Sequence, residues 1–135
     1  MTIFDKTMGL IERTLDMRST RQRMISSNIA NEETPGYRAK DLHFQEALSK
    51  AAQGRIPVVP VSTHAQHIGP RGDSFGLVTG RVAEVPAGDL PLDANSVNME
   101  LELAKLSDNA MQYNSAATIM AIRMRQLLSA IRDAR

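Results

Sequence analysis

The three histidines are the residues of this sequence best suited to metal binding or proton transfer. His64 and His67 lie three residues apart, whereas His43 is distant in sequence. A zinc site needs three or four protein ligands, and the sequence offers neither a Cys nor a nearby pair of acidic residues to complete the set. We therefore interpret His64 and His67 as part of a surface loop, and we predict no metal site and no bound cofactor.

The sequence gives little support for a catalytic nucleophile or a phosphate-binding loop. The chain has no Cys, so it has no thiol nucleophile and no thiolate metal ligand. Two glycine-containing segments, residues 69–73 and 76–80, lack the spacing of a phosphate-binding loop or a dinucleotide fingerprint. We interpret both segments as turns and predict that the protein is not an enzyme.

A basic cluster in the N-terminal segment could bind acidic lipid or nucleic acid. It comprises Arg13, Arg18, Arg21 and Arg23. The formal net charge is only +1, which gives no general electrostatic hold on nucleic acid. We favour ion pairs with the acidic start of a neighbouring subunit's C-terminal helix, which carries Glu100, Glu102 and Asp108.

The composition favours helices packed side by side over a compact globule. Aromatic residues make up 4% of the chain and Trp is absent, whereas compact cores use these large side chains heavily. No apolar run is long enough to span a bilayer, so we predict no membrane insertion. The first residues lack the features of a cleavable secretory signal.

Residues 1–31 form the first predicted segment, an N-terminal amphipathic helix. Apolar residues recur there at spacings of four and three, as one face of a helix requires. This row comprises Phe4, Met8, Ile11, Leu15, Ile25 and Ile29. Arg18 and Gln22 interrupt the row, and the sequence leaves open whether they face a partner helix or a lumen.

Residues 93–135 form a second, stronger helical segment. The apolar row comprises Met99, Leu103, Leu106, Ala110, Tyr113, Ala117, Met120, Met124, Leu127 and Ile131. Such a row is typical of a coiled coil. The two terminal helices would be about 50 Å and about 40 Å long, against a radius of gyration of about 14 Å for a compact chain of this size. We predict a mainly α, elongated, coiled-coil-like pair of helices whose remaining apolar surface is buried against other chains.

Between the helices we expect a turn with a short helix over residues 32–53, and then a middle segment over residues 54–92. The middle segment holds most of the prolines and glycines, and we predict it to be irregular or to form a small β structure. Residues 56–61 and 80–85 have the character of short strands. Residues 41–52 are predicted to be the short helix.

The turn has a distinctive sequence. Asn31 is a good helix terminator, and Pro35-Gly36 has the chemistry of a type II turn, after which Tyr37 can fold its ring back onto the helix end. The residues that define it are Asn28, Ile29, Ala30, Asn31, Thr34, Pro35, Gly36 and Tyr37.

These residues resemble a known family. The string Ser27-Asn-Ile-Ala-Asn31, followed after two residues by Thr34-Pro-Gly-Tyr-Arg38, is similar to the N-terminal signature of the bacterial flagellar axial proteins of the rod and hook. The order of elements matches as well, and the short length together with residues 92–102 is closest to the proximal rod proteins. Two alternatives stay open: a sister rod protein of the FlgC or FlgF type, and a helical adaptor or chaperone that forms a closed homodimer.

The resemblance implies a structural subunit of the flagellar basal body. Such subunits assemble through their terminal helices into a hollow helical drive shaft that transmits torque for motility. The implied partners are further copies, rod proteins of the FlgC, FlgF and FlgG types, the adapter FliE and the membrane-ring protein FliF. The implied location is the periplasmic rod, reached through the flagellar type III export apparatus without a cleaved signal peptide.

The resemblance also implies an export motif. Rod and hook substrates carry a Phe, three residues and an apolar residue, which the export gate protein FlhB reads. Phe44 and Leu48 match this pattern just after the turn, and they could equally be ordinary helix-packing residues. Phe4 and Met8 fit the same pattern, but their position favours packing in the helix row.

Overall fold

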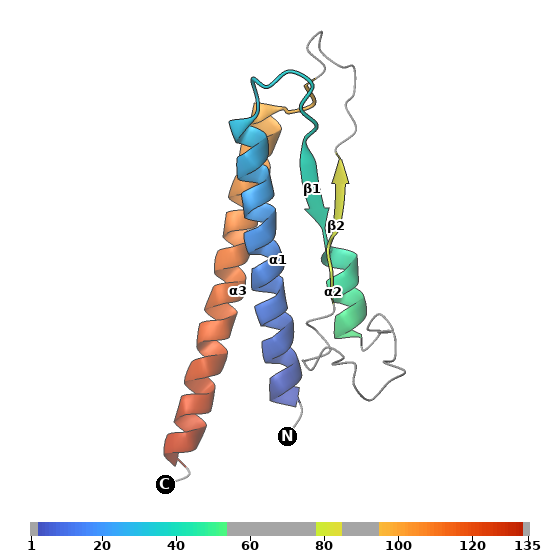
Figure 1. The fold of residues 1–135 in the computed structure, drawn as a ribbon. Coiled ribbons are helices and arrows are strands. Elements are labelled where there is room, and N and C mark those ends of the chain that lie inside the picture. Colours follow the sequence, from blue (N-terminus) through green and yellow to red (C-terminus); the bar gives the residue numbers. More distant parts are fainter. Residues whose placement is uncertain (1–2, 54–77, 85–94, 134–135) are drawn as a thin grey trace, which may run out of the picture.

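The protein is an elongated helical molecule built around one long antiparallel helix pair. A computed structural model describes residues 3–53, 78–84 and 95–133. The elements are α1 (Ile3–Ala30), β1 (Lys40–His43), α2 (Gln45–Ala52), β2 (Arg81–Glu84) and α3 (Met99–Asp133). Figure 1 shows α1 and α3 side by side in opposite directions, with α2 and the two strands against the other side of α1. This confirms the predicted fold class of two long terminal helices with a small β part between them.

The ends of the long helices lie where the sequence predicts them. The Asn98 side chain accepts the Leu101 backbone N–H through Oδ1 at 3.0 Å, so Asn98 caps α3, with Glu100 and Glu102 in the first turn. α1 ends at Ala30, and Gly36 has a φ of 72°. The Tyr37 N–H donates to the Thr34 carbonyl at 3.2 Å, which together with the positive φ matches the predicted type II turn.

The small sheet joins two segments that are far apart in sequence. β1 and β2 are antiparallel, with Lys40 opposite Glu84 and His43 opposite Arg81. The predicted strand at residues 80–85 is therefore confirmed over Arg81–Glu84, whereas residues 56–61 lie outside the described residues.

The predicted helix at residues 41–52 is wrong in its first turn. Residues 41–43 belong to β1, and α2 begins only at Gln45. The backbone there pairs with β2, and Leu42 and Phe44 are buried in the core instead of continuing a helical face. Pairing with a distant strand is not visible in local propensity, and it overrides the helical pattern.

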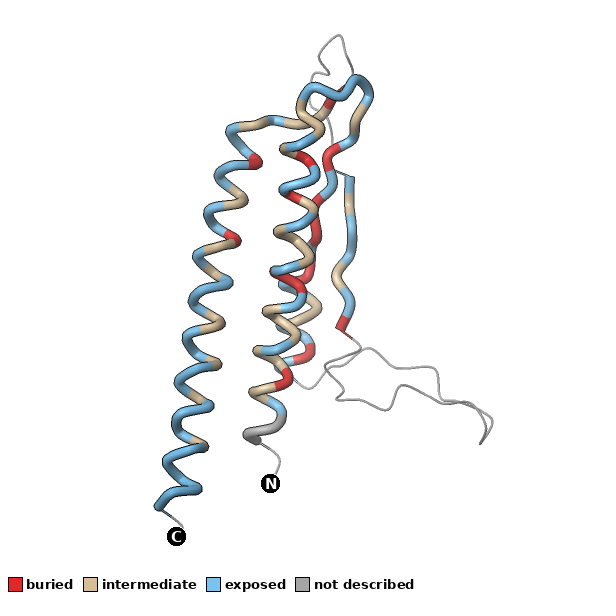
Figure 2. Tube along the Cα trace, turned by 60° about the vertical axis from the view of Figure 1, so that its left-hand side comes forward, coloured by how far each residue is buried: buried red, intermediate tan, exposed pale blue. Residues whose placement is uncertain are grey.

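The apolar core lies between α1 and the β1–α2 segment. One cluster joins Met17, Leu42 and Phe44, and a second joins Ala51 and Val78. In Figure 2 the buried positions concentrate on α1, β1 and α2, whereas α3 is exposed along most of its length. α3 therefore contributes little to the core, although it is the longest element.

Candidate functional site

The turn that carries the sequence signature is bound to the start of α3. The Asn95 amide nitrogen reaches the carbonyls of Asn31 at 3.0 Å and of Thr34 at 2.9 Å. The Ser96 N–H donates to the Tyr37 carbonyl at 3.1 Å, and the Ser96 hydroxyl accepts the Ala39 N–H at 2.9 Å. Asn95, Ser96 and Asn98 are all residue types that commonly cap the start of a helix. In the structure Asn95 and Ser96 fasten the turn, and Asn98 alone of the three caps α3.

Tyr37 folds back as predicted. Its hydroxyl lies 3.4 Å from the Ser27 hydroxyl and 3.4 Å from Asn28 Oδ1, to which it donates. These long contacts are weak hydrogen bonds. They place the ring against the last turns of α1, so the chain leaves α1 in a defined direction.

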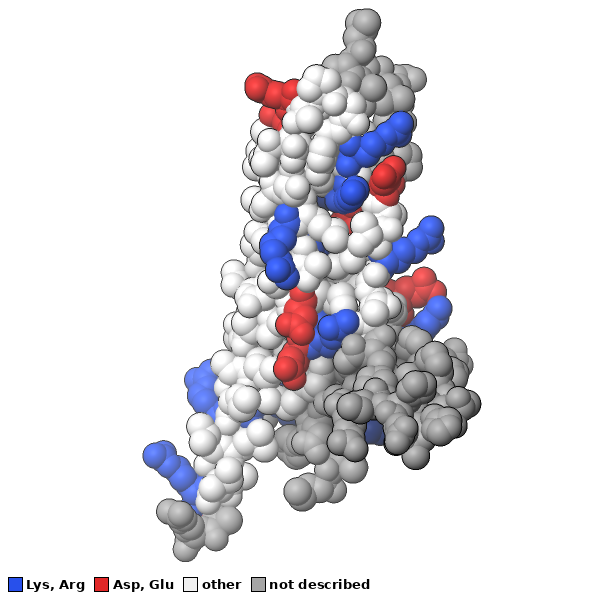
Figure 3. All heavy atoms as spheres, viewed as in Figure 1, with Lys and Arg blue, Asp and Glu red and all other residues white. Residues whose placement is uncertain are grey.

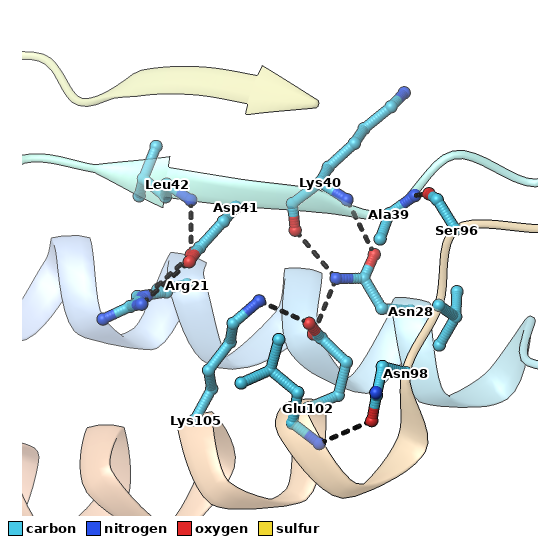
Figure 4. Close-up of polar contacts among 12 residues, drawn as sticks. Arg21, Asn28, Ala39, Lys40, Asp41, Leu42, Ser96, Asn98, Glu102 and Lys105 are labelled. Carbon is cyan, nitrogen blue, oxygen red and sulfur yellow. Dashed lines mark hydrogen bonds and ion pairs between the residues drawn. The ribbon is translucent and has the colours of Figure 1, made fainter. Parts of the chain in front are cut away.

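Asn28 is the polar centre of this end of the molecule (Figure 4). Its amide nitrogen donates to the Lys40 carbonyl and to Glu102 Oε2, each at 2.8 Å, and its Oδ1 accepts the Lys40 N–H at 3.0 Å. Lys105 Nζ lies 2.6 Å from Glu102 Oε1. Asn28 and Glu102 are both 1% exposed, so one satisfied network joins α1, β1 and α3.

A second polar link joins α1 to β1. Arg21 donates from Nε to Asp41 Oδ1 at 2.7 Å and from Nη2 to Oδ2 at 2.8 Å, and the Leu42 N–H donates to Asp41 Oδ1 at 2.7 Å. Burial by itself would raise the pKa of Asp41. The hydrogen bonds and charge of Arg21, with the Leu42 N–H, outweigh burial and hold the pKa below its ordinary value.

These links correct the expected ion pairs between subunits. We expected the basic cluster to pair with a neighbour's Glu100, Glu102 and Asp108. Arg21 is instead bound to Asp41 of its own chain, and Glu102 is buried against Asn28 and Lys105. Neither Arg21 nor Glu102 is available to a neighbour in this fold.

Further along the pair, Asn109 of α3 contacts α1. Its amide nitrogen donates to the Arg18 carbonyl at 3.0 Å and to Gln22 Oε1 at 2.8 Å. Gln22 therefore faces α3, which answers the question left open by the sequence. The Arg18 guanidinium lies 5.5 Å from the centre of the Phe44 ring, within cation–π range.

α3 contacts α1 through one row of its residues. The apolar row that the sequence predicts on α3 lies only partly within this contact row. The buried or half-buried positions of α3 include Glu102, Leu106, Asn109, Ala116, Met120, Arg123 and Leu127. Residues of the predicted apolar row that directly follow these contact positions are more exposed, with Leu103 48% and Met124 49% exposed. The polar residues Glu102, Asn109 and Arg123 thus occupy inner positions, beside an apolar row that faces outward.

Large apolar side chains cover the outside of α3. Nine of them are between 39% and 65% exposed: Leu101, Leu103, Met111, Tyr113, Ile119, Ile122, Met124, Leu128 and Ile131. We call these nine residues the outer surface of α3. In Figure 3 the side of the molecule formed by α3 carries few charged groups over most of its length.

The remaining described residues of the two predicted apolar rows, on α1 and α3, are at least partly covered within the chain. On α1, Ile25 is fully buried, and Met8, Ile11, Leu15 and Ile29 are half-buried. On α3, Met99, Leu106, Ala110, Ala117, Met120 and Leu127 are half-buried. The Phe4 side chain lies outside the described residues.

The residues of the expected export motif pack inside the folded chain. Phe44 is 3% exposed in the cluster with Met17 and Leu42, and Leu48 is half-buried against both apolar clusters. In this fold the pair therefore serves as core.

Several sequence features lie outside the described residues. They include His64, His67 and the glycine-containing segment 69–73. Residues 72–76 read Gly-Asp-Ser-Phe-Gly, which matches the bare pattern of a nucleophile elbow, and they too lie outside the described residues. Within the described part of the chain, no three His, Cys, Asp or Glu residues could hold a metal ion, and no helix is long and apolar enough to cross a membrane.

Comparison with known proteins gives consistent matches. A family model described as "Flagella basal body rod protein" matches residues 12–38. The flagellar basal body rod protein FlgB of Aeromonas hydrophila is 32% identical over 129 residues, covering 96% of this chain and 95% of that protein. FlgB of Yersinia enterocolitica is 32% identical, covering 97% and 99%, and FlgB of Escherichia coli (strain K12) is 30% identical, covering 96% and 95%.

Proposed function

The chain belongs to the FlgB family of flagellar basal body rod proteins, and from this premise we propose how it builds the rod. As a structural rod subunit it assembles with other rod and basal body components. In our proposal it associates with further copies through α1 and α3 into the proximal part of a hollow helical shaft that transmits torque. Its work is mechanical, and it catalyses no reaction.

The outer surface of α3 carries this proposal. Nine large apolar side chains lie exposed along α3 between Leu101 and Ile131, and such a concentration on one helix indicates that it interacts with other molecules. Burial of each such side chain contributes about 1.5–3 kcal/mol. Among the described elements α3 packs mainly on α1, so we propose that other molecules cover its exposed apolar side chains.

The polar contacts near the turn suit a part that bears load. Asn28, Asn95 and Glu102 fix the end of α1 against the start of α3. Hydrogen bonds have narrow geometric tolerance, so they hold the register of the helix pair, while apolar contacts between subunits give stiffness through many small contributions.

We extend the proposal to partners and export. Contacts with FliE, FliF and rod proteins of the FlgC, FlgF and FlgG types would surround this subunit in the periplasmic rod. FlhB would read Phe44 and Leu48 during type III export, which proceeds without a cleaved signal peptide. Because Phe44 is buried in the folded chain, only an unfolded chain can present this motif.

Self-association of the purified full chain tests the proposal. Analytical ultracentrifugation over a range of concentrations, with electron microscopy of the products, should show open-ended assemblies that grow with concentration. A helical lattice needs contacts between different surfaces that do not close. A dimer of fixed size at every concentration would instead support a closed homodimeric adaptor and would overturn the rod assembly proposed here.

Deletion of the gene in the source bacterium gives the cellular test. Cells without this protein should lack complete rods and should be non-motile, and the intact gene should restore both. Normal basal bodies in the deletion strain would contradict the proposed role.

A further inference from the structure

α3 is longer than α1 and extends past its start. The hydrogen bond between Asn28 and Glu102 sets the alignment of the antiparallel pair. Because both helices rise by about 1.5 Å per residue, the start of α1 at Ile3 lies level with about Leu127 of α3. The following residues, 128–133, therefore extend about 9 Å past α1, as the C-terminal end of α3 shows in Figures 1 and 2. We call residues 128–133 the extension.

The extension is exposed and combines apolar surface with a cation. Every residue of it is exposed, with Leu128 62% and Ile131 64% exposed. Arg132 makes no ion pair among the described residues, and Asp133 accepts a hydrogen bond from Ser129 of the same helix at 3.4 Å. Leu128 and Arg132 are four residues apart, so they share one face of the helix.

The opposite end of the helix pair is acidic. It consists of the turn and the start of α3, residues 28–37 and 95–102, which contain no Lys or Arg. Glu33 and Glu100 are exposed there and have no ion pair among the described residues. Leu101, next to Glu100, is 48% exposed. This end, which we call the acidic end, thus also combines apolar surface with charge.

The charges at the two ends of the molecule are opposite in sign. Residues 123–133 of α3 carry three arginines and one acid, whereas the acidic end carries only acids. Figure 3 shows acidic atoms at the turn end of the helix pair and basic atoms toward the C-terminal end of α3. Copies that point in the same direction along one line would bring opposite charges together. Copies that meet at two like ends would bring like charges together, which is unfavourable.

We propose that the extension of one copy docks on the acidic end of the next copy. In this contact Arg132 pairs with Glu33 or Glu100, and Leu128 and Ile131 cover Leu101. Burial of the apolar side chains supplies affinity, and the charges supply direction.

The inference rests on the self-association proposed above and adds a specific end-to-end contact to it. The contact joins two different surfaces, so each bound copy leaves one extension and one acidic end unoccupied. Further copies can therefore add without closing the assembly, as a helical lattice requires.

Charge reversal at the extension is the first test. Arg132→Glu places like charges in the contact, so self-association of the full chain, measured by analytical ultracentrifugation, should weaken by about tenfold or more. Arg132 is exposed, so the midpoint of urea unfolding should stay nearly unchanged. Arg23→Glu is the matched control, because Arg23 is exposed in α1 about two helical turns before its end and the substitution makes the same change in net charge.

Mixing of variants identifies the partner surface. Glu33→Lys or Glu100→Lys should by itself also weaken association, because it places like charge opposite Arg132. An equimolar mixture of Arg132→Glu with the effective Lys variant should recover most of the association of the wild type. In an alternating assembly of the two variants, every contact again joins opposite charges. A variant that associates poorly because it is misfolded would not be rescued in this way.

The outcomes separate this contact from the self-assembly on which it rests. Equal association of wild type and Arg132→Glu, or an equal loss with Arg23→Glu, would overturn the end-to-end contact and leave the rod proposal standing. A loss with Arg132→Glu that neither mixture rescues would overturn the assignment of the extension to the acidic end of a second copy. Failure of the wild type to associate at all would instead count against the self-assembly proposed above.

Discussion

Asn28 of α1 donates a hydrogen bond to Oε2 of Glu102 in α3 over 2.8 Å, and both side chains are buried. Of the two amide hydrogens of Asn28, one serves Glu102 and the other the Lys40 carbonyl. A buried polar pair of this kind contributes less net stability than an apolar pair, but it discriminates strongly against a shifted register. In a subunit whose two long helices must present a fixed outer surface, a fixed register of the helix pair matters more than a small further gain in folding stability.

Removal of the Asn28 side chain should therefore be costly. In Asn28→Ala the Glu102 carboxylate loses a donor while it stays buried, and the Lys40 N–H and carbonyl lose their partner. We expect the free energy of unfolding of the full chain to fall by about 2–3 kcal/mol, as is typical when charged or buried groups are left without partners. Urea denaturation followed by circular dichroism measures this change.

Two comparisons sharpen the Asn28 experiment. Ser26→Ala changes an exposed position two residues away and should alter stability by no more than about 0.5 kcal/mol. Asn28→Asp should cost more than Asn28→Ala, because it places a second negative charge against Glu102. An Asn28→Ala variant as stable as the wild type would show that water replaces the lost donor at no cost.

The Arg21–Asp41 pair predicts a specific acid sensitivity. The pKa of Asp41 is below its ordinary value of 3.8 in the folded chain, so the unfolded chain binds more protons between those two pKa values. The stabilisation by this carboxylate is therefore complete above about pH 5 and is lost as the pH falls through the folded pKa. Asp41→Asn removes the ion pair and should lower the free energy of unfolding by about 1.5–3 kcal/mol at pH 7.

The difference between wild type and Asp41→Asn isolates this effect from other carboxylates. Urea denaturation at a series of pH values should give a constant difference at neutral pH that shrinks below pH 4. Glu46→Gln provides the comparison, because Glu46 pairs with Lys50 in full contact with solvent. Its effect should be small, as for most exposed pairs. A wild-type to Asp41→Asn difference that persists undiminished at pH 2 would contradict the assignment.

Local sequence signals were sufficient for most of the fold. The spacing of apolar residues located α1 and α3, and Asn31, Pro35 and Gly36 located the turn. These features depend on neighbours within a few residues, which a sequence displays directly. β1 pairs with a strand about 40 residues away, and Phe44 packs on a residue of α1 about 27 positions away. No local sequence pattern predicts such contacts.

The interaction surfaces were only partly predictable for a different reason. The sequence shows an apolar row on α3, but it does not show which residues of α3 face α1. In the structure the inner positions include the polar residues Glu102 and Asn109. Their spacing of seven residues was a usable signal, because polar residues that recur at heptad spacing beside an apolar row often set the register of a helix pair. The position of the Arg18 guanidinium over Phe44 has no sequence signal, since it depends on the tertiary fold.

Gly36 gives a prediction about the turn. Its φ of 72° lies in the left-handed region, and a Cβ built there would meet no atom within 4 Å. The cost of Gly36→Ala is therefore a pure backbone effect, and we expect about 1–2 kcal/mol lower stability in urea denaturation. Gly36→Asn should cost less, because Asn adopts this conformation more readily. A larger loss for Asn than for Ala would indicate that side-chain volume, and not φ, limits this position.

The outer surface of α3 leads to the prediction that bears most directly on assembly. Met124→Gln exchanges an apolar for a polar side chain of similar length at a position 49% exposed, and Gln is a good helix former. The isolated subunit should keep its stability within about 0.5 kcal/mol. Self-association should weaken by about tenfold or more, because burial of a Met contributes about 1.5–3 kcal/mol and 1.4 kcal/mol corresponds to tenfold. Ultracentrifugation of the full chain measures the association, with the exposed neighbour Arg125→Gln as a matched control that should retain it. If Met124→Gln lowered subunit stability and left association unchanged, Met124 would belong to the fold of the subunit, and the contact between subunits would have to be sought on another face.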